Sequence, residues 1–399
     1  MLRSVVVVGA SLAGLKACEG LRRGGFAGSI ALVGAESHLP YDRPPLSKEF
    51  LAGKSPFERL ALTTEGKLAD LDLDLELGAR ARAVDPARRV VRLESGRELP
   101  FEGLVIATGA TPRRLRPGGD LEGVLTLRRL EDALRLRDLL EVGGVRLVVV
   151  GGGFLGMEVA ATARGLGAEV TVVEPQPAPL ARVVGPLVGR ALTEAHAEHG
   201  VRLRTGVGVT ALVGESRVEG VRLDDGSLIA ADVVLVAVGV VPETGWLEGS
   251  GLDLADGVRC GPSLLAAPGV VAAGDVARWP HPLAGGLIRL EHRTNAAEQG
   301  AHAAASLLAG PGAPAFTSVP YFWSDQFDLK IQSIGIPGPL DEVRVVAGSI
   351  AERRFVACYG RAGRLSAVVA FGRPRQLMAF RGLLERRAPL EEALRVELD

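Results

Sequence analysis

The chain has 399 residues, a formal net charge of −1 and a hydrophobic content of 47%. This length suffices for two or three domains, and the near-neutral charge gives no basic field that would attract nucleic acid or an anionic membrane. The sequence contains no apolar run of 18 or more residues and no signal-peptide pattern at its start. We therefore expect a cytoplasmic protein without a membrane span.

Cysteine and histidine spacing argues against disulfide and metal chemistry. Cys18, Cys260 and Cys358 are far apart and form no CxxC or CxxxxC pair, so we expect them to be small buried hydrophobes. His196 and His199 have helical i, i+3 spacing but no third ligand nearby. We expect them on the solvated face of a helix, and we predict no metal site.

The first informative feature is a glycine-rich turn after an apolar, β-branched run at residues 4–8. Gly9 and Gly14 flank a segment in which Ser11 replaces the second glycine of the usual pattern, and Glu36 ends the next apolar run. Such a strand–turn–helix presents backbone amides to a pyrophosphate, and an acid about 20 residues later accepts hydrogen bonds from a ribose. Ser11 implies either a looser contact or a hydroxyl that itself bonds to phosphate.

The same pattern occurs a second time in the middle of the chain. Residues 146–150 form an apolar run that leads into Gly151, Gly153 and Gly156, and Glu174 ends the following run. Two copies that each have strand, helix and acid predict two bound dinucleotides. The expected fold class is α/β, with two Rossmann-like dinucleotide-binding domains and a C-terminal α+β interface domain.

The remaining apolar runs, glycines and prolines predict where the domains of the chain begin and end. Apolar strands at 103–107 and 232–238 each lead to a glycine and a proline, which we interpret as crossings between domains. We also predict a strand at 90–93, a helix at 127–137, a short strand at 269–273 and a helix at 290–300. After a linker at 309–314, strands at 343–347, 354–359 and 365–371 are closed by one helix around Met378. The expected domains are 1–112 with 242–315 for FAD, 113–241 for NAD, and 316–399.

Several segments resemble the FAD-dependent NAD(P)H:ferredoxin reductases that serve bacterial oxygenases and cytochromes P450, a group similar to putidaredoxin reductase. They are residues 40–48 (PYDRPPLSK), 107–113 (ATGATPR), 151–158 (GGGFLGME), 273–277 (AGDVA), 295–299 (NAAEQ) and 320–328 (PYFWSDQFD). The resemblance covers essentially the whole chain. It implies hydride transfer from NADH to FAD, followed by one-electron transfers to a [2Fe–2S] or other small ferredoxin that docks transiently and supplies an oxygenase or cytochrome P450.

The resemblance also implies site residues. For FAD they are Gly9, Ser11, Ala13, Gly14, Glu36, Arg43, Lys48, Ala81, Ala107, Thr108, Gly109, Arg128, Asp275 and Arg293. For NAD they are Gly151, Gly153, Phe154, Leu155, Gly156, Glu158, Glu174 and Gly239.

Two of these residues are assigned to catalysis. Lys48 is a fixed cation that would stabilise a reduced, anionic flavin. Glu158 approaches the nicotinamide carboxamide in the family, although its place near the start of a helix also fits a simple partner of the helix dipole. A carboxylate at Glu174, with no arginine before Arg182, favours NADH over NADPH.

The route of electron exit is open at this stage. Many relatives have tryptophan at the position of Arg293. Three roles are open for the arginine of this chain: contact with an acidic ferredoxin, contact with the flavin, or an ion pair with Glu291 or Glu298. The arginines at 373, 375, 381, 386 and 387 form either a basic docking face or the solvated side of a helix.

Two rival functions remain. One is a redox signalling flavoprotein that resembles apoptosis-inducing factor, which has a similar loop at 43–48. The other is an NADH oxidase that reduces oxygen directly. The absence of a cysteine pair, and of a cysteine near Ser47, argues against disulfide, peroxide and coenzyme A disulfide reductases of the same fold.

Overall fold

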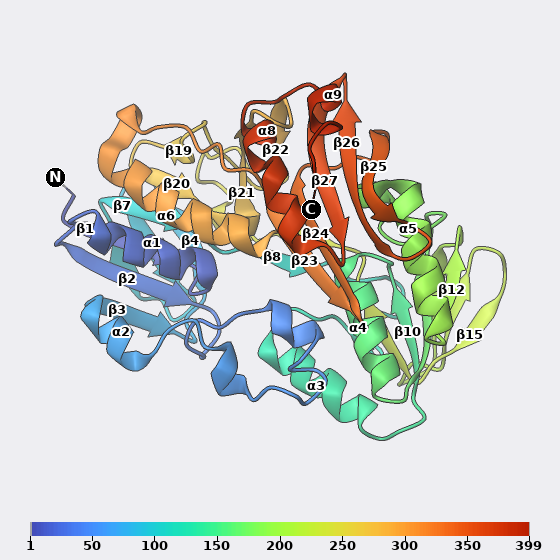
Figure 1. The fold of residues 1–399 in the computed structure, drawn as a ribbon. Coiled ribbons are helices and arrows are strands. Elements are labelled where there is room, and N and C mark those ends of the chain that lie inside the picture. Colours follow the sequence, from blue (N-terminus) through green and yellow to red (C-terminus); the bar gives the residue numbers. More distant parts are fainter. Residues whose placement is uncertain (1, 399) are drawn as a thin grey trace. The chain divides into compact units, whose positions relative to one another are not determined.

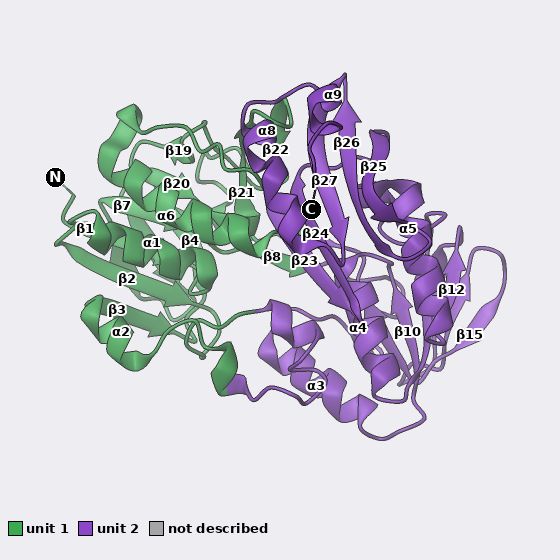
Figure 2. Ribbon diagram, viewed as in Figure 1, with its two compact units in different colours: residues 1–42, 58–111, 241–320 green, residues 43–57, 112–240, 321–399 purple. Residues whose placement is uncertain are grey.

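The computed structural model describes residues 2–398 and divides into two compact units (Figure 2). Unit 1 comprises residues 1–42, 58–111 and 241–320, and unit 2 comprises residues 43–57, 112–240 and 321–399. The chain passes from one unit to the other at five places. Two of them lie in the short strands β8 (Ala110–Pro112) and β17 (Val240–Pro242), and the others are at 42–43, 57–58 and 320–321. The sequence assigned residues 316–399 to a domain of their own, whereas residues 321–399 belong to the same unit as the middle segment.

Unit 1 is built on a six-stranded sheet in the order β19-β20-β7-β1-β2-β3 (Figure 1). The strands are β1 (Ser4–Val8), β2 (Ser29–Gly34), β3 (Leu73–Leu77), β7 (Gly103–Ile106), β19 (Leu265–Ala267) and β20 (Val270–Ala272). All neighbours are parallel except β19 and β20. Because β2 and β7 lie on opposite sides of β1, the strand order reverses there, and such a switch point is where ligands bind in open α/β sheets.

Helices α1 (Leu12–Arg23) and α6 (Arg293–Ala309) lie side by side in unit 1 (Figure 1). They approach closely because small residues face each other: a Cβ added at Gly300 would lie 2.2 Å from the carbonyl oxygen of Ala13. The alanine-rich face of α6 is therefore a contact surface.

The rest of unit 1 consists of small antiparallel and mixed sheets beside the main one. They contain β4 (Ala81–Asp85), β5 (Val90–Leu93), β6 (Glu98–Pro100), β18 (Val258–Arg259), β21 (Ala277–His281) and β22 (Gly286–Ile288), with the short helix α2 (Glu65–Asp70).

Unit 2 contains a second parallel sheet in the order β12-β11-β10-β16-β9. Its strands are β9 (Val124–Leu125), β10 (Arg146–Val150), β11 (Glu169–Glu174), β12 (Arg202–Thr205) and β16 (Val233–Val236). Helices α3 (Leu130–Leu140), α4 (Phe154–Gly165) and α5 (Ala181–Glu198), with the three-stranded sheet of β13 (Val209–Val213), β14 (Gly220–Leu223) and β15 (Leu228–Ala230), complete this part. The order reverses at β10, so the second sheet repeats the switch point of the first.

The C-terminal segment of unit 2 is an antiparallel sheet in the order β23-β24-β27-β26-β25. The strands are β23 (Tyr321–Gln326), β24 (Leu329–Gly335), β25 (Glu342–Ser349), β26 (Arg354–Arg361) and β27 (Arg364–Phe371). This sheet shares one hydrophobic core with α5, in which Val184 and Leu192 pack with Phe322 and Tyr359. The Tyr359 hydroxyl also donates to the carbonyl of Val184 at 2.7 Å. This common core explains why the segment clusters with the middle of the chain.

The predicted single helix around Met378 is wrong. The chain there forms α7 (Pro374–Leu377), a 3-10 turn (Met378–Phe380), α8 (Arg381–Glu385) and α9 (Leu390–Ala393). Arg387 has the left-handed φ of 54° and Pro389 follows it, so a continuous helix cannot pass this point. The predicted fold class, two Rossmann-like domains plus a C-terminal α+β domain, is confirmed.

Candidate functional site

The glycine turn of unit 1 is closed by two backbone approaches that exclude any side chain. Gly9 has a φ of +121°, and a Cβ added there would lie 2.0 Å from the carbonyl oxygen of Ala107, just past β7. A Cβ at Gly14 would lie 1.9 Å from the carbonyl oxygen of Gly9. The absence of a side chain at Gly9 therefore lets the turn pack against the backbone that follows β7. The absence of one at Gly14 lets α1 begin directly against the turn.

The glycine turn of unit 2 has the same geometry. A Cβ at Gly151, with a φ of +108°, would lie 2.4 Å from the carbonyl oxygen of Ala237, and one at Gly156 would lie 2.1 Å from the carbonyl oxygen of Gly151. The middle glycine is different, because a Cβ at Gly153 would meet nothing within 4 Å. This open position explains how the first copy carries Ser11 without distorting the turn.

Both turns present an uncompensated helix N-terminus. Neither α1 nor α4 has an acidic residue in its first turn, and their N-cap residues, Ser11 and Gly153, make no side-chain capping bond. The first amides of such a helix, together with its dipole, favour an anion. The cradles therefore fit the pyrophosphates of two dinucleotides.

Each turn has its predicted acid at the end of the second strand. Glu36 follows β2 and accepts a hydrogen bond from the buried Tyr41 hydroxyl at 2.5 Å. Glu174 ends β11, where its Oε2 accepts from the amide of Gly152 at 2.7 Å and its Oε1 from the amide of Gln176 at 2.9 Å. Each carboxylate oxygen has two lone pairs, so these bonds orient the acid and leave acceptor capacity for ribose hydroxyls.

Most of the other predicted residues of unit 1 follow strands of the main sheet, and Ala81 belongs to a separate small sheet. Ala107, Thr108 and Gly109 follow β7, and the Thr108 hydroxyl donates to the carbonyl of Glu243 at 2.7 Å. Asp275 lies in the turn after β20, which pairs with β7. Ala13 lies in the first turn of α1 and Ala81 begins β4.

Arg293, at the first position of α6, is held by an ion pair that the sequence did not predict. Its Nε lies 2.7 Å and 2.9 Å from the two carboxylate oxygens of Asp42. Of the three roles that the sequence left open for Arg293, an ion pair is the one that the structure contains, but its partner is neither Glu291 nor Glu298. Glu291 pairs with Arg289, and Glu298 accepts from the Ser318 hydroxyl.

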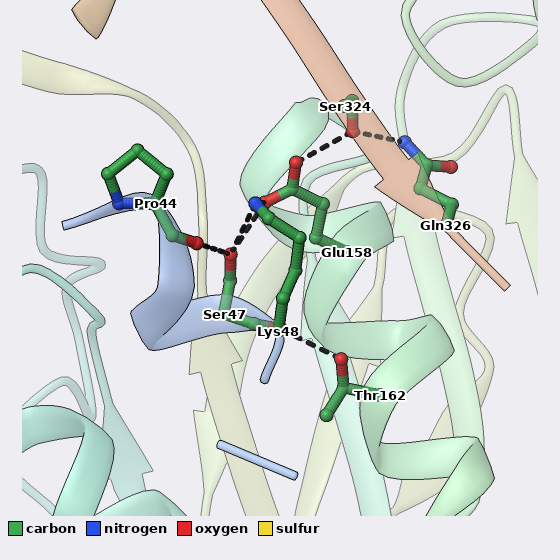
Figure 3. A network of polar contacts seen from close by, with 7 residues as sticks. All are labelled: Pro44, Ser47, Lys48, Glu158, Thr162, Ser324 and Gln326. Carbon is green, nitrogen blue, oxygen red and sulfur yellow. Dashed lines mark hydrogen bonds and ion pairs between the residues drawn. The ribbon is translucent and has the colours of Figure 1, made fainter. Parts of the chain in front are cut away.

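Unit 2 contains a compact polar cluster around Glu158 (Figure 3). Glu158 Oε2 accepts from Lys48 Nζ at 2.7 Å and from the Ser47 hydroxyl at 2.5 Å. Its other oxygen, Oε1, accepts from the Ser324 hydroxyl at 2.7 Å. The Thr162 hydroxyl, one turn further along α4, donates to the carbonyl of Ser47 at 2.8 Å.

This cluster brings together the two predicted catalytic residues. The side chains of Lys48 and Glu158 are 11% and 7% exposed, so the pair is largely shielded from water and its charge-assisted bonds are strong. Sequence reasoning missed the other members, Ser47, Thr162 and Ser324. Ser47 and Ser324 lie inside the two motifs at 40–48 and 320–328, which was the available signal.

The remaining predicted residues of unit 2 lie around the same elements. Arg43 donates from Nη1 to the carbonyl of Arg128 at 2.6 Å. Phe154 and Leu155 form the first turn of α4, where the Phe154 ring lies 4.7 Å from that of Phe322. Gly239, with a φ of +93°, follows β16. The predicted FAD residues are thus divided, with Arg43, Lys48 and Arg128 in unit 2 and the others in unit 1.

The cysteines and histidines differ in their surroundings within residues 2–398. Cys18, Cys260 and Cys358 are buried free thiols, and burial raises the pKa of each to about 12. No group of three metal-ligating side chains occurs within residues 2–398. The expectation that His196 faces solvent is wrong: it is fully buried, because the C-terminal sheet covers that face of α5. His199 is exposed and stacks on Phe327 at 3.9 Å.

The arginines of the C-terminal segment differ in their pairing. Arg381 pairs with Glu385, Arg386 pairs with Glu392, and Arg373 donates to Gln376. Arg375 and Arg387 are exposed, and neither has an ion-pair partner in the part of the chain that the structure describes.

Among the described helices, none is both long and apolar enough to span a bilayer.

Comparisons with known proteins agree with this geometry. Residues 3–300 match the pyridine nucleotide-disulphide oxidoreductase family, and residues 321–397 match the reductase C-terminal family. The chain is 38% identical over 95% of its length, and 92% of the relative's, to the ferredoxin reductase subunit of 5,5'-dehydrodivanillate O-demethylase from a Sphingobium species. It is 37% identical over 99% of its length, and 93% of the relative's, to rhodocoxin reductase from Rhodococcus erythropolis.

A solved structure is similar over nearly the whole chain. The covalent putidaredoxin reductase–putidaredoxin complex matches with a TM-score of 0.93 and 34% identity, covering 99% of this chain and 96% of the matched chain.

Proposed function

The chain belongs to the pyridine nucleotide-disulphide oxidoreductase family, and we propose that it is the NADH-oxidising ferredoxin reductase of an oxygenase or cytochrome P450 system. As an oxidoreductase of this group it uses FAD and NAD(P)H. The observation that carries the proposal is the combination of two glycine cradles with three thiols that are all buried and unpaired. Electrons that enter from a nicotinamide therefore have no disulfide to reduce, and they leave toward an external acceptor.

FAD, when bound, supplies the redox chemistry: it accepts a hydride from NADH and releases two electrons one at a time to an iron–sulfur protein. The chain supplies binding and orientation. We assign the cradle of Gly9, Ser11, Ala13 and Gly14, with Glu36, Ala81, Ala107, Thr108, Gly109, Asp275, Arg293, Arg43 and Arg128, to FAD. We assign the cradle of Gly151, Gly153, Phe154, Leu155 and Gly156, with Glu174 and Gly239, to NADH.

Lys48 and Glu158 are the residues that we propose to act in catalysis. Lys48 provides a fixed positive charge, which favours a developing negative charge nearby. Glu158 holds that ammonium group at 2.7 Å and keeps it from rotating into solvent. Because Glu158 accepts three hydrogen bonds from side chains, its carboxylate is fixed in one orientation.

Glu174 supports the proposed preference for NADH. Its carboxylate is anchored on the turn by two backbone amides, so it cannot swing away from a nucleotide bound at the cradle. A fixed carboxylate accepts hydrogen bonds from two free ribose hydroxyls and repels a 2′-phosphate.

The partner that we propose is a small acidic ferredoxin that docks transiently. Relatives of the chain are named as reductase components of dioxygenase systems and as rhodocoxin and putidaredoxin reductases. We propose a cytoplasmic location, where NADH and reduced thiols are both present; the buried free cysteines are compatible with such a compartment.

Steady-state kinetics with the purified protein test this function. We expect NADH-dependent reduction of at least one ferredoxin in a panel of [2Fe–2S], [3Fe–4S] and [4Fe–4S] proteins, and release of FAD rather than FMN on denaturation. Rapid oxygen consumption without ferredoxin would instead indicate an NADH oxidase. A long-lived charge-transfer complex with slow electron transfer to every ferredoxin would indicate the signalling flavoprotein. A colourless protein that FAD cannot reconstitute would overturn the proposal.

A further inference from the structure

Behind Glu158, a line of buried polar side chains runs into the C-terminal sheet and ends on α5. Ser324 donates to Glu158 Oε1 at 2.7 Å, Gln326 Nε2 donates to the Ser324 oxygen at 3.1 Å, and Gln326 Oε1 lies 2.9 Å from His196 Nε2. Figure 3 shows the first two of these bonds. Ser324, Gln326 and His196 are each at most 1% exposed. The line therefore joins α4, β23 and α5 through side chains alone.

The hydrogen bonds in this line all point toward Glu158. A serine hydroxyl has one hydrogen, and Ser324 must use it toward the carboxylate, which only accepts. Ser324 then accepts from the Gln326 amide nitrogen, so the Gln326 amide oxygen faces His196. Because that oxygen only accepts, His196 Nε2 must carry the hydrogen. The geometry thus fixes both the amide orientation and the histidine tautomer.

The far end of the line is buried. His196 Nδ1 has no hydrogen-bond partner among residues 2–398, and the ring packs against Phe327 at 5.0 Å. Burial lowers the pKa of His196 to about 4, so the ring is neutral near pH 7 and contributes a donor rather than a charge. Apolar side chains of the core shared by α5 and the C-terminal sheet surround it.

We propose that Ser324 and Gln326, backed by His196, are positioning residues that fix the orientation and charge of Glu158 and so hold Lys48 in place. The inference rests on the proposed function. It gives the C-terminal sheet a part in hydride transfer, because β23 supplies the only donor that reaches Glu158 Oε1 within residues 2–398. Without the Ser324 hydroxyl, the Glu158 carboxylate is free to rotate about its last side-chain bond. The Lys48 ammonium group, which is bonded to that carboxylate, then changes position as well.

The decisive comparison is between two buried serines on adjacent strands. Ser324→Ala removes the donor to Glu158. Ser333→Ala, on β24, removes a fully buried hydroxyl that has no hydrogen-bond partner in the described chain. Ser324→Thr restores a hydroxyl, and Gln326→Leu removes the link to His196.

Anaerobic stopped-flow mixing with NADH, without ferredoxin, gives the limiting rate of flavin reduction and the apparent Kd for NADH. We expect Ser324→Ala to lower the limiting rate about ten-fold, the effect of one charge-assisted hydrogen bond, and to change Kd by less than about two-fold. We expect Gln326→Leu to fall between Ser324→Ala and the wild type, and Ser324→Thr to recover most of the rate. The flavin absorption spectrum and midpoint potential should shift in Ser324→Ala and not in Ser333→Ala.

A second measurement needs no variant. Nitrogen NMR of histidine-labelled wild-type protein should show His196 neutral and protonated at Nε2 from about pH 8 to pH 5. A ring protonated at Nδ1 and not at Nε2 would overturn the direction of the line. A wild-type rate of flavin reduction and an unshifted spectrum in Ser324→Ala would overturn the positioning role of Ser324. If NADH reduces the flavin with this Ser324 dependence but no ferredoxin is reduced, the proposed function fails and the inference stands. If ferredoxin is reduced and Ser324→Ala behaves like Ser333→Ala, the inference alone fails.

Discussion

Arg293 and Asp42 form a two-oxygen ion pair across 251 residues of sequence, which ties the first turn of α6 to the loop before residue 43. The two side chains are 32% and 24% exposed, so the pair is partly screened and contributes at most about 1 kcal/mol to stability. Its main effect is positional: the Asp42 carboxylate orients the Arg293 side chain toward the loop before residue 43.

The first prediction concerns this pair. Arg293→Glu places two acids together and should lower the thermal midpoint and the affinity for FAD, because the loop and α6 then repel each other. The exchange Arg293→Asp with Asp42→Arg should restore both properties in part. Thermal unfolding and FAD titration of the apoprotein measure these effects. Equal behaviour of the single and the exchanged variants would show that the ion pair has no role.

The second prediction concerns electron exit. Arg375 and Arg387 have no ion-pair partner in the described chain, whereas Arg381 and Arg386 are neutralised by Glu385 and Glu392. If an acidic ferredoxin docks here, Arg375→Glu and Arg387→Glu should each slow ferredoxin reduction several-fold and leave NADH-to-ferricyanide activity nearly intact.

A matched control and a salt series complete that experiment. Arg222 is an exposed arginine of β14 that has no ion pair within residues 2–398. Arg222→Glu should leave ferredoxin reduction unchanged. The wild-type rate should fall as salt rises, because exposed charges are screened beyond about 8 Å at physiological ionic strength. A rate indifferent to salt and to both substitutions would place the docking surface elsewhere and assign these arginines to a solvated face.

The third prediction concerns nucleotide choice. We expect kcat/KM for NADH to exceed that for NADPH by about ten-fold or more, which corresponds to about 1.4 kcal/mol of differential binding. Glu174→Ala with Gln176→Arg should narrow the gap, because a repelling carboxylate is replaced by a cation on the same turn. Equal use of both nucleotides by the wild-type protein would refute the assignment of Glu174.

The fourth prediction separates the two kinds of glycine in the second cradle. Gly156→Ala forces a Cβ to within 2.1 Å of a backbone oxygen and should destabilise unit 2 by about 2 kcal/mol or more. Gly153→Ser meets open space and should change stability by less than about 0.5 kcal/mol. Thermal midpoints of the two variants provide the comparison, and a large loss in Gly153→Ser would contradict the structural equivalence with Ser11.

Local patterns in the sequence were sufficient to predict both glycine cradles and their acids, because each motif lies within one strand–turn–helix unit whose geometry is set by neighbouring residues. The partners of Glu158 and Arg293 were not predictable in this way. Ser324 lies 166 residues from Glu158, and such pairs depend on how distant strands and helices pack. The same reason explains His196: its helical spacing indicated an exposed face, but the C-terminal sheet covers α5 there.

The broken C-terminal helices reflect backbone conformation at Arg387, a residue type that gives no local signal for a left-handed φ.

The fifth prediction follows from the burial of His196. Its pKa is lowered to about 4 in the folded protein by desolvation, against about 6.5 when unfolded. Between these values the unfolded chain binds a proton that the folded chain does not, so stability falls as the pH drops from about 6.5 to about 4. The full loss at pH 4 is about 3 kcal/mol from this residue. His281, whose pKa burial also lowers, adds to it in the same direction.

Replacing His196 removes part of this acid sensitivity. His196→Asn should lower the thermal midpoint at pH 7.5, because it disturbs the bond to Gln326, yet flatten the decline of the midpoint between pH 6.5 and pH 4.5. Thr193→Ala, on the same helix, loses only a hydrogen bond to the Gly189 carbonyl and should shift the whole curve without changing its slope. If both variants keep the wild-type slope, then His196 already carries a proton in the folded state at these pH values. In that case His196 would be charged and would donate from both ring nitrogens. The Nδ1–H would then need an acceptor, but Nδ1 has no hydrogen-bond partner among residues 2–398, so this outcome would contradict the neutral ring that the further inference requires.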